Sequence, residues 1–75
     1  MTMFNGVKYS DRHGGAFDRG SADSYYRRAF QPHMFEAGTH TSRLIPEAEM
    51  SAEDRAAYAA GYAYNEDLGD YKDWR

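Results

Sequence analysis

The most regular pattern of apolar and polar positions lies in residues 52–65. This stretch is rich in alanine, and Tyr58 and Tyr62 recur four residues apart, as on one face of an α-helix. Immediately before it, Ser51 and Asp54 have the spacing of a capping box, in which the serine hydroxyl accepts a backbone N–H at the helix start. The pattern therefore predicts a helix over residues 52–65.

A second, weaker periodic stretch covers residues 17–28. It follows Gly14-Gly15, a pair that is expected to interrupt regular structure. Its small and apolar residues recur at three-to-four spacing, which predicts another helix. Gly20 lies inside this helix and Gly61 inside the other. A glycine in a helix interior costs about 1 kcal/mol relative to alanine, so both positions indicate a close approach of another backbone, the alternative at Gly20 being a glycine that the helix merely tolerates. We predict that the two helices pack through Gly20 and Gly61.

Outside these helices the sequence predicts little regular structure. Asn5-Gly6 favours a type I′ turn and a short N-terminal β-hairpin, although its flanks are short enough for a frayed arm instead. Residues 29–46 contain both prolines of the chain, which favours a long loop. The apolar pair Leu44-Ile45 predicts one short strand within that loop.

We expect a single, mainly α domain over residues 1–75, built as a small helical hairpin with a long loop. Its parts are an N-terminal arm (1–15), the helical hairpin (16–65) and an acidic, aromatic tail (66–75) that folds back to cover the core. A chain of this size buries only about 60% of its unfolded surface. Seven Tyr, four Phe and one Trp must build most of the core, because aliphatic residues are few. Without cysteine, a homodimer is one remaining source of added stability.

Charge is distributed unevenly along the chain, whose net charge is −3. Residues 1–43 carry six Lys and Arg against four Asp and Glu, whereas residues 44–75 carry three against eight. The acidic C-terminal half argues against general attraction to nucleic acid or anionic lipid. No apolar run reaches the ~20 residues of a membrane span, and the N-terminus lacks the order of a signal peptide. We therefore expect no membrane association and a cytoplasmic protein.

Residue types used in catalysis and metal binding are present, but not at working spacings. His13, His33 and His40 lie in predicted loops, and none is four residues from a second ligand on a predicted helix. The same loops give no rigid support for a Ser–His–Asp arrangement. The sequence therefore predicts that the protein is not an enzyme and binds no metal or cofactor.

Two sets of charged residues are candidates for binding a partner. The first set is acidic, and it either imitates a row of phosphates that fits a basic nucleic-acid channel or is only a solvated surface. Its members are Glu47, Glu49, Glu53, Asp54, Glu66, Asp67, Asp70 and Asp73.

The second set combines cations with rings suited to stacking on the bases of single-stranded RNA. An ordinary helix ion pair between Arg19 and Asp23 is the structural alternative, and we do not expect direct nucleic-acid binding. The members of the set are Arg19, Tyr25, Tyr26, Arg27 and Arg28.

Several short motifs in the predicted helices resemble the ribosome modulation factor family. They are Arg19-Gly20-x-x-Asp23, Arg27-Arg28, Pro32 and Tyr58-x-x-Gly61-Tyr62. The resemblance covers residues 19–62 and implies a compact helical hairpin. It also implies a ribosome-associated modulator that binds ribosomal RNA. That family is strongly basic, whereas this chain is acidic and has a longer spacer between its helices.

A more extensive similarity is to short phage and prophage proteins of uncharacterised role. It is carried by Asp-Arg-Gly-Ser-Ala-Asp-Ser-Tyr-Tyr at 18–26, by Pro32-His33, by Ala-Gly-Tyr at 60–62 and by Asp-Tyr-Lys-Asp-Trp at 70–74. This similarity implies a mobile-element accessory protein. We therefore expect a stoichiometric inhibitor of a host protein or ribonucleoprotein complex, such as a CRISPR effector, that acts through its acidic residues. The alternatives are a ribosome-associated modulator and a structural or dimerisation module.

Overall fold

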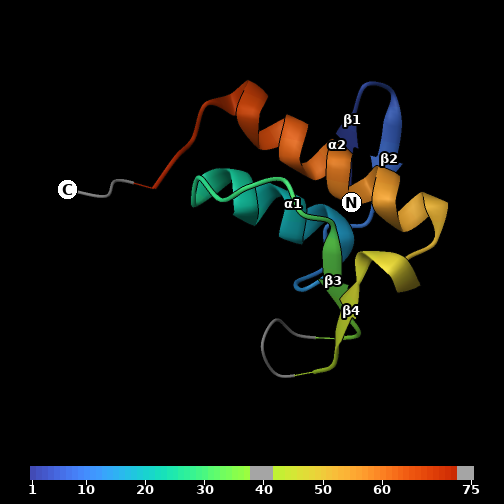
Figure 1. Ribbon diagram of the computed structural model, residues 1–75. Coiled ribbons are helices and arrows are strands. Elements are labelled where there is room, and N and C mark those ends of the chain that lie inside the picture. Colours follow the sequence, from blue (N-terminus) through green and yellow to red (C-terminus); the bar gives the residue numbers. More distant parts are fainter. Residues whose placement is uncertain (38–41, 73–75) are drawn as a thin grey trace.

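A computed structural model describes residues 1–37 and 42–72 of the chain. Two α-helices and two antiparallel two-stranded hairpins make up the fold (Figure 1). The predicted mainly α helical hairpin is therefore wrong, and the chain is a small α+β protein. In chain order the elements are β1 (Thr2–Phe4), β2 (Val7–Tyr9), α1 (Ala16–Tyr25), β3 (His33–Phe35), β4 (Leu44–Pro46), the 3₁₀ helix η1 (Glu47–Glu49) and α2 (Ala52–Leu68).

The two helices do not form a helical hairpin because they run in the same general direction (Figure 1). In a helical hairpin, a short loop joins antiparallel helices. Here the connection over 26–51 includes β3 and β4, which carry the chain back toward the start of α1 before α2 begins. The C-terminal ends of the helices consequently lie together, and the Ser24 hydroxyl donates to the Glu66 carboxylate at 2.6 Å.

The N-terminal segment is the predicted β-hairpin and not a frayed arm. Asn5 and Gly6 have φ values of 51° and 78°, as a type I′ turn requires, and Phe4 pairs with Val7 across it. The hairpin lies against the helices through its aromatic rings. In one of these contacts the ring of Tyr9 stacks on that of Phe17 of α1, with centroids 5.3 Å apart.

The segment expected as a long loop forms a second hairpin. The strand predicted at Leu44-Ile45 is confirmed as β4, and its partner β3, which the sequence did not indicate, places Met34 opposite Ile45. Phe35 is buried, and its backbone N–H donates to the Gly14 carbonyl at 2.8 Å. This contact fixes β3 beside the start of α1.

Helix α2 begins as predicted and extends beyond its predicted end at Asn65. The Ser51 hydroxyl accepts the backbone N–H of Asp54 at 3.0 Å. The helix continues to Leu68 because the next residue is Gly69, which adopts φ 69° and donates its N–H to the Asn65 carbonyl at 3.0 Å. Glycine in this left-handed position is a common helix stop.

Helix α1 ends at Tyr25, before its predicted end at Arg28, because Arg27 adopts φ 58°. The Arg27 N–H donates to the Ser24 carbonyl at 3.0 Å, and the Arg28 N–H donates to the Asp23 carbonyl at 2.7 Å. These two bonds form a Schellman motif, in which the left-handed residue is usually glycine. Because an arginine occupies that position, the sequence shows no recognisable helix stop.

The predicted contact between the helices through Gly20 and Gly61 is confirmed. A Cβ atom added to Gly20 would lie 2.0 Å from the carbonyl oxygen of Tyr58, and one added to Gly61 would lie 2.0 Å from that of Phe17. Each glycine therefore lies directly against the backbone of the other helix. The surrounding interior is aromatic, as the composition predicts, because Phe17 and Tyr58 are both buried there.

The described start of the C-terminal tail folds back onto the helix pair. The backbone N–H of Lys72 donates to the Tyr25 carbonyl at 2.7 Å. The side-chain amide of Asn65 donates to the carbonyl of Asp70 at 2.8 Å. Trp74, the largest residue of the expected tail, lies outside the described residues.

Replacing either glycine by alanine tests the helix contact. In an ordinary helix interior, glycine to alanine adds about 1 kcal/mol of stability. Gly20→Ala and Gly61→Ala should instead lower the free energy of unfolding by about 1 to 3 kcal/mol, because the new methyl group forces the backbones apart. Chemical denaturation measures the change. Ala56→Leu, at an exposed position of α2, is the control and should have little effect. A gain of stability in both glycine variants would contradict the contact.

Candidate functional site

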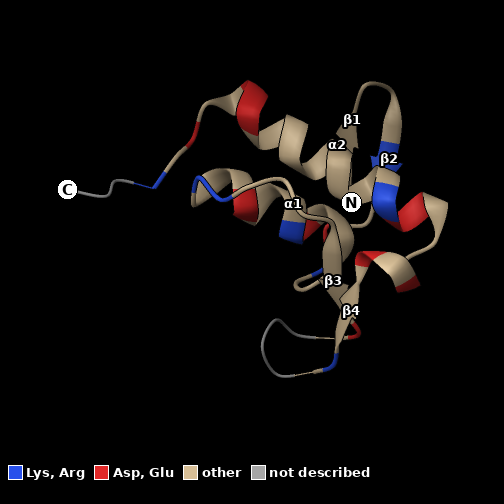
Figure 2. Cartoon of the chain, in the orientation of Figure 1, with Lys and Arg blue, Asp and Glu red and all other residues tan. Residues whose placement is uncertain are grey.

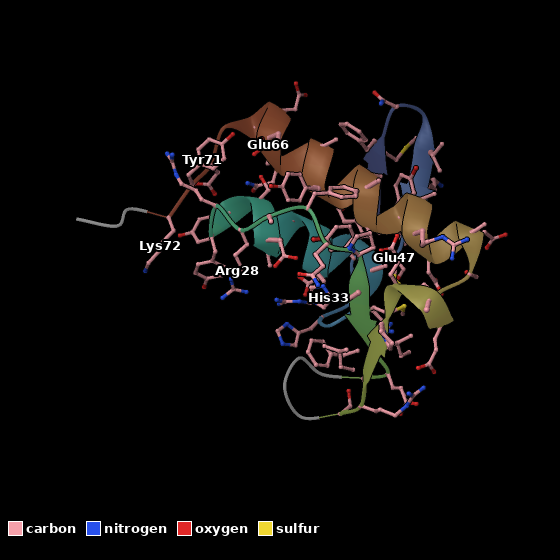
Figure 3. The ribbon with its side chains drawn as sticks, viewed as in Figure 1. Arg28, His33, Glu47, Glu66, Tyr71 and Lys72 are labelled. Atoms are coloured by element: carbon pink, nitrogen blue, oxygen red, sulfur yellow. The ribbon has the colours of Figure 1, made fainter. Side chains whose placement is uncertain are left out.

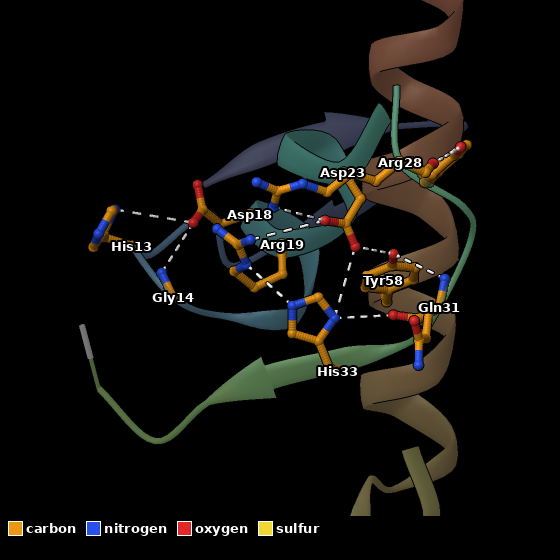
Figure 4. A network of polar contacts seen from close by, with 10 residues as sticks. His13, Gly14, Asp18, Arg19, Asp23, Arg28, Gln31, His33 and Tyr58 are labelled. Carbon is orange, nitrogen blue, oxygen red and sulfur yellow. Dashed lines mark hydrogen bonds and ion pairs between the residues drawn. The ribbon is translucent and has the colours of Figure 1, made fainter. Parts of the chain in front are cut away.

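A buried carboxylate, Asp23, organises the polar interior of the protein (Figure 4). Asp23 is 3% exposed, and the hydroxyl of Tyr58 donates to its Oδ2 atom. The guanidinium groups of Arg19 and Arg28 lie 3.8 and 3.6 Å from its Oδ1 atom. The carboxylate is therefore paired on both oxygens, as a buried charge must be if it is not to destabilise the fold.

His33 joins strand β3 to this cluster. Its Nε2 atom accepts a hydrogen bond from Nε of Arg19 at 3.3 Å, and its Nδ1 atom lies 2.9 Å from the Gln31 carbonyl. An arginine can only donate, so Nε2 must be unprotonated, and the Gln31 carbonyl can only accept, so Nδ1 must carry the proton. The neutral imidazole thus satisfies both neighbours and acts as a structural link between α1 and β3.

Tyr58 connects α2 to the same cluster. Burial and, secondly, the hydrogen bond to Asp23 raise the pKa of its hydroxyl, which therefore stays a donor at neutral pH. The same oxygen accepts the backbone N–H of Gln31 at 3.1 Å. Tyr58 is 0% exposed, and its hydroxyl links α2 to α1 and to the segment before β3.

The residues predicted as one acidic face are divided between the two ends of α2 (Figure 2). The N-terminal acidic group comprises Glu47, Glu49, Glu53 and Asp54, and the C-terminal acidic group comprises Glu66, Asp67 and Asp70. At 1.5 Å per residue, roughly 20 Å of helix separates Glu53 from Glu66. Neighbouring helix residues point about 100° apart, so Glu53 and Asp54 do not share one side of α2, whereas Glu53 and Asp67, fourteen residues apart, do. Asp73 lies outside the described residues.

Some of these carboxylates already have partners. Glu49 forms an ion pair with Arg43 at 3.3 Å. Hydrogen bonds, first from Ser24 and then from Tyr71, lower the pKa of the Glu66 carboxyl. The hydrogen bond to Glu66 likewise raises the pKa of the Tyr71 hydroxyl. Glu66 therefore stays charged, and it ties the end of α2 to the end of α1.

The structure also divides the predicted cationic set. Arg19 is 7% exposed and pairs with Asp23, which is the structural alternative that the sequence left open. Arg27 and Arg28, by contrast, are exposed at the end of α1. Tyr25 and Tyr26 lie beside them, half buried, with ring centroids 5.0 Å apart.

Tyr71 and Lys72, which lie outside the predicted cationic set, also lie at this end of the molecule (Figure 3). The guanidinium of Arg27 lies over the ring of Tyr71 at 4.7 Å, and that of Arg28 lies over the ring of Tyr26 at 4.9 Å. Lys72 is the residue after Tyr71 and adds a third cation. We call Arg27, Arg28, Lys72, Tyr26 and Tyr71 the cation–tyrosine cluster. Only the placement of aromatic residues between charges in the tail gave a sequence signal for it.

Replacing Tyr58 by Phe tests the role of the buried cluster. Loss of the hydroxyl leaves the Oδ2 atom of Asp23 without its hydroxyl donor and the Gln31 N–H without an acceptor, which should lower the free energy of unfolding by about 1 to 3 kcal/mol at neutral pH. Tyr64→Phe, whose ring packs on Phe17, is the matched control and should change stability by no more than about 0.5 kcal/mol. Equal losses in the two variants would contradict the role assigned to Tyr58.

The raised pKa of Tyr58 also predicts that the free energy of unfolding depends on pH in the alkaline range. The pKa of Tyr58 is raised by folding, so the folded protein keeps a proton that the unfolded chain releases above about pH 10. Stability should be full below that pH and fall as the pH rises beyond it. Tyr58→Phe should make this fall shallower without abolishing it, because the pKa values of Tyr62 and Tyr71 are raised as well. Chemical denaturation between about pH 8 and 11 measures this pH dependence. If Tyr58→Phe leaves the slope of unfolding free energy against pH unchanged, Tyr58 does not contribute to it.

Three further observations bear on function. In the part of the chain that the structure describes, no group of three or more His, Asp or Glu side chains is arranged to hold a metal ion. Over the same residues, neither helix is long and apolar enough to cross a bilayer. Comparison of the chain with protein-family models, with curated proteins and with solved structures found no match.

Proposed function

We propose that this chain is a phage-type accessory protein that inhibits a host nucleic-acid-handling or defence complex, such as a CRISPR effector, by stoichiometric binding through its acidic residues. The similarity of residues 18–26 and 70–74 to phage and prophage proteins supports the proposal. The contacts of Asp23, His33 and Tyr58 support it too, because Tyr58 donates to Asp23 and His33 accepts from Arg19, which leaves these side chains engaged within the fold. Most of the acidic residues, by contrast, lie on the exposed surface that a partner meets.

The placement of acidic groups at both ends of an exposed helix carries the proposal. Between the two groups the exposed residues of α2 are Arg55, whose guanidinium donates to the Met50 carbonyl, and the small residues Ala56 and Ala63. The separation of roughly 20 Å corresponds to about six phosphate steps along one strand of a duplex, at 3.4 Å per step. Carboxylates at that spacing complement a basic channel at two points. Such complementarity raises the association rate and selects the partner.

A ribosome-associated modulator is the second candidate, and the cation–tyrosine cluster favours it. Two of its three cations already lie over tyrosine rings, at 4.7 and 4.9 Å. Rings and cations in alternation bind single-stranded nucleic acid by base stacking and phosphate pairing. The net charge of −3 argues against this function, because the rest of the chain repels RNA, which is a polyanion.

Charge reversal at each end of α2 tests the first candidate. One variant carries Glu47→Lys with Glu53→Lys, and the other carries Asp67→Lys with Asp70→Lys. Each should weaken binding to the partner captured from a bacterial lysate by about tenfold or more, which is about 1.4 kcal/mol. Wild-type binding should also weaken as salt screens the charges. Circular dichroism checks that α2 still forms in each variant.

The matched control for these reversals is Glu36→Lys, because Glu36 is an exposed acid outside both acidic groups. It makes the same change in net charge per substitution and should retain binding. If the control weakens binding as much as the reversals do, only the net charge matters. If none of the variants weakens binding, the acidic groups are solvated surface and the first candidate is wrong.

Neutralising the cations tests the second candidate. Arg27→Gln, Arg28→Gln and Lys72→Gln should together abolish binding to a labelled single-stranded ribosomal RNA oligonucleotide, measured by fluorescence anisotropy. For the wild type, three phosphate contacts predict a slope of about −2 in log affinity against log salt, since each contact contributes about −0.7. Lys8→Gln, on β2, is the control. Absence of wild-type binding, or an equal loss in the control, would reject this candidate.

A further inference from the structure

A shallow, open groove of about 660 Å³ runs along the outer side of α2. Its floor is made of Ala59 and Ala63, four residues apart on one face of the helix. Phe4 of β1 and Phe30, in the segment after α1, line the groove beside this floor. The rings of Phe4, Phe30 and Tyr62 thus line the groove together with alanine side chains that are too short to fill it.

The aromatic walls of this groove are fixed by contacts with α2. The ring of Phe30 is 53% exposed, yet it packs edge-on against Tyr58 and Tyr62, with centroids 5.2 and 5.3 Å away. The ring of Phe4 makes an edge contact with Tyr64 at 5.9 Å. A site whose walls are already held in place loses little conformational entropy when it is filled.

The charge around the groove selects its occupant. Glu66 and Asp67 line its end, and no Lys, Arg or His is among its lining residues. The C-terminus of α2 adds the negative end of the helix dipole at the same place. A nucleic acid is repelled by this charge. A second copy of the chain that docks here with its α2 parallel, about a two-fold axis along the helix, would bring Glu66 and Asp67 toward their own equivalents.

We propose that this groove binds a basic amphipathic segment of a partner protein, with apolar side chains over Ala59 and Ala63 and a Lys or Arg beside Glu66 and Asp67. The inference rests on the proposed function, since it names the part of a host protein that the C-terminal acidic group meets. Apolar contact supplies the affinity, and the carboxylates set the direction in which the segment lies.

A synthetic probe tests the groove without the host partner. The probe is a fluorescein-labelled peptide of about 15 residues with Leu at helical spacing and Lys elsewhere. The wild type should bind it, and Ala63→Trp, which fills the floor, and Asp67→Lys, which reverses the rim charge, should each lower the affinity by about tenfold. Ala56→Trp and Glu36→Lys are matched controls outside the groove and should stay within about twofold.

Two altered peptides separate specific binding from general attraction. Replacing Leu by Ser, or Lys by Glu, should abolish binding, because the site needs both the apolar and the basic side chains. Retained binding by Ala63→Trp or by the serine peptide would overturn the inference. Self-association of the wild type that Ala63→Trp abolishes, measured by sedimentation, would assign the groove to a second copy and overturn it too. Because no host protein is present, failure here is distinct from failure of the charge reversals against the captured partner.

Discussion

The contact between the backbones of α1 and α2 is the constraint on which the rest of the structure depends. Gly20 lies against the carbonyl of Tyr58, and Gly61 lies against that of Phe17, at distances that no side chain tolerates. This approach fixes α2 in register with α1, and the register places the Tyr58 hydroxyl on the Asp23 carboxylate. A chain with so few aliphatic residues gains from such close packing, because dispersion contacts rise steeply as surfaces approach.

The buried carboxylate then organises segments that have little core of their own. Asp23 pairs with Arg28 just after the helix end, and Tyr58 accepts the N–H of Gln31 ahead of β3. His33 continues the same network into the strand. Asp23, His33 and Tyr58 therefore stabilise the fold through their mutual network of contacts. The proposed functions use exposed charges and a groove outside this network. Polar networks of this kind are stabilising only when every member is satisfied.

The sequence predicted those parts of the fold that local chemistry encodes. The Ala-rich stretch with its cap gave α2, Asn5-Gly6 gave the N-terminal turn, and two helix-interior glycines gave the helix contact. Strand β3 was missed because three residues are too few to show a period. The end of α1 was missed because an arginine, Arg27, occupies a position that usually shows glycine.

The candidate site was less predictable for a related reason. A count of charges along the chain hides their division between the two ends of α2, although the length of the predicted helix implies that division. The buried pairing of Arg19 and the contact of Tyr71 with Arg27 both depend on tertiary contacts that no spacing reveals. A double-mutant cycle between Gly20→Ala and Tyr58→Phe tests most directly whether the helix contact and the buried carboxylate form one unit. The free energies of unfolding should show a coupling of about 1 kcal/mol or more, whereas additive losses would contradict the account.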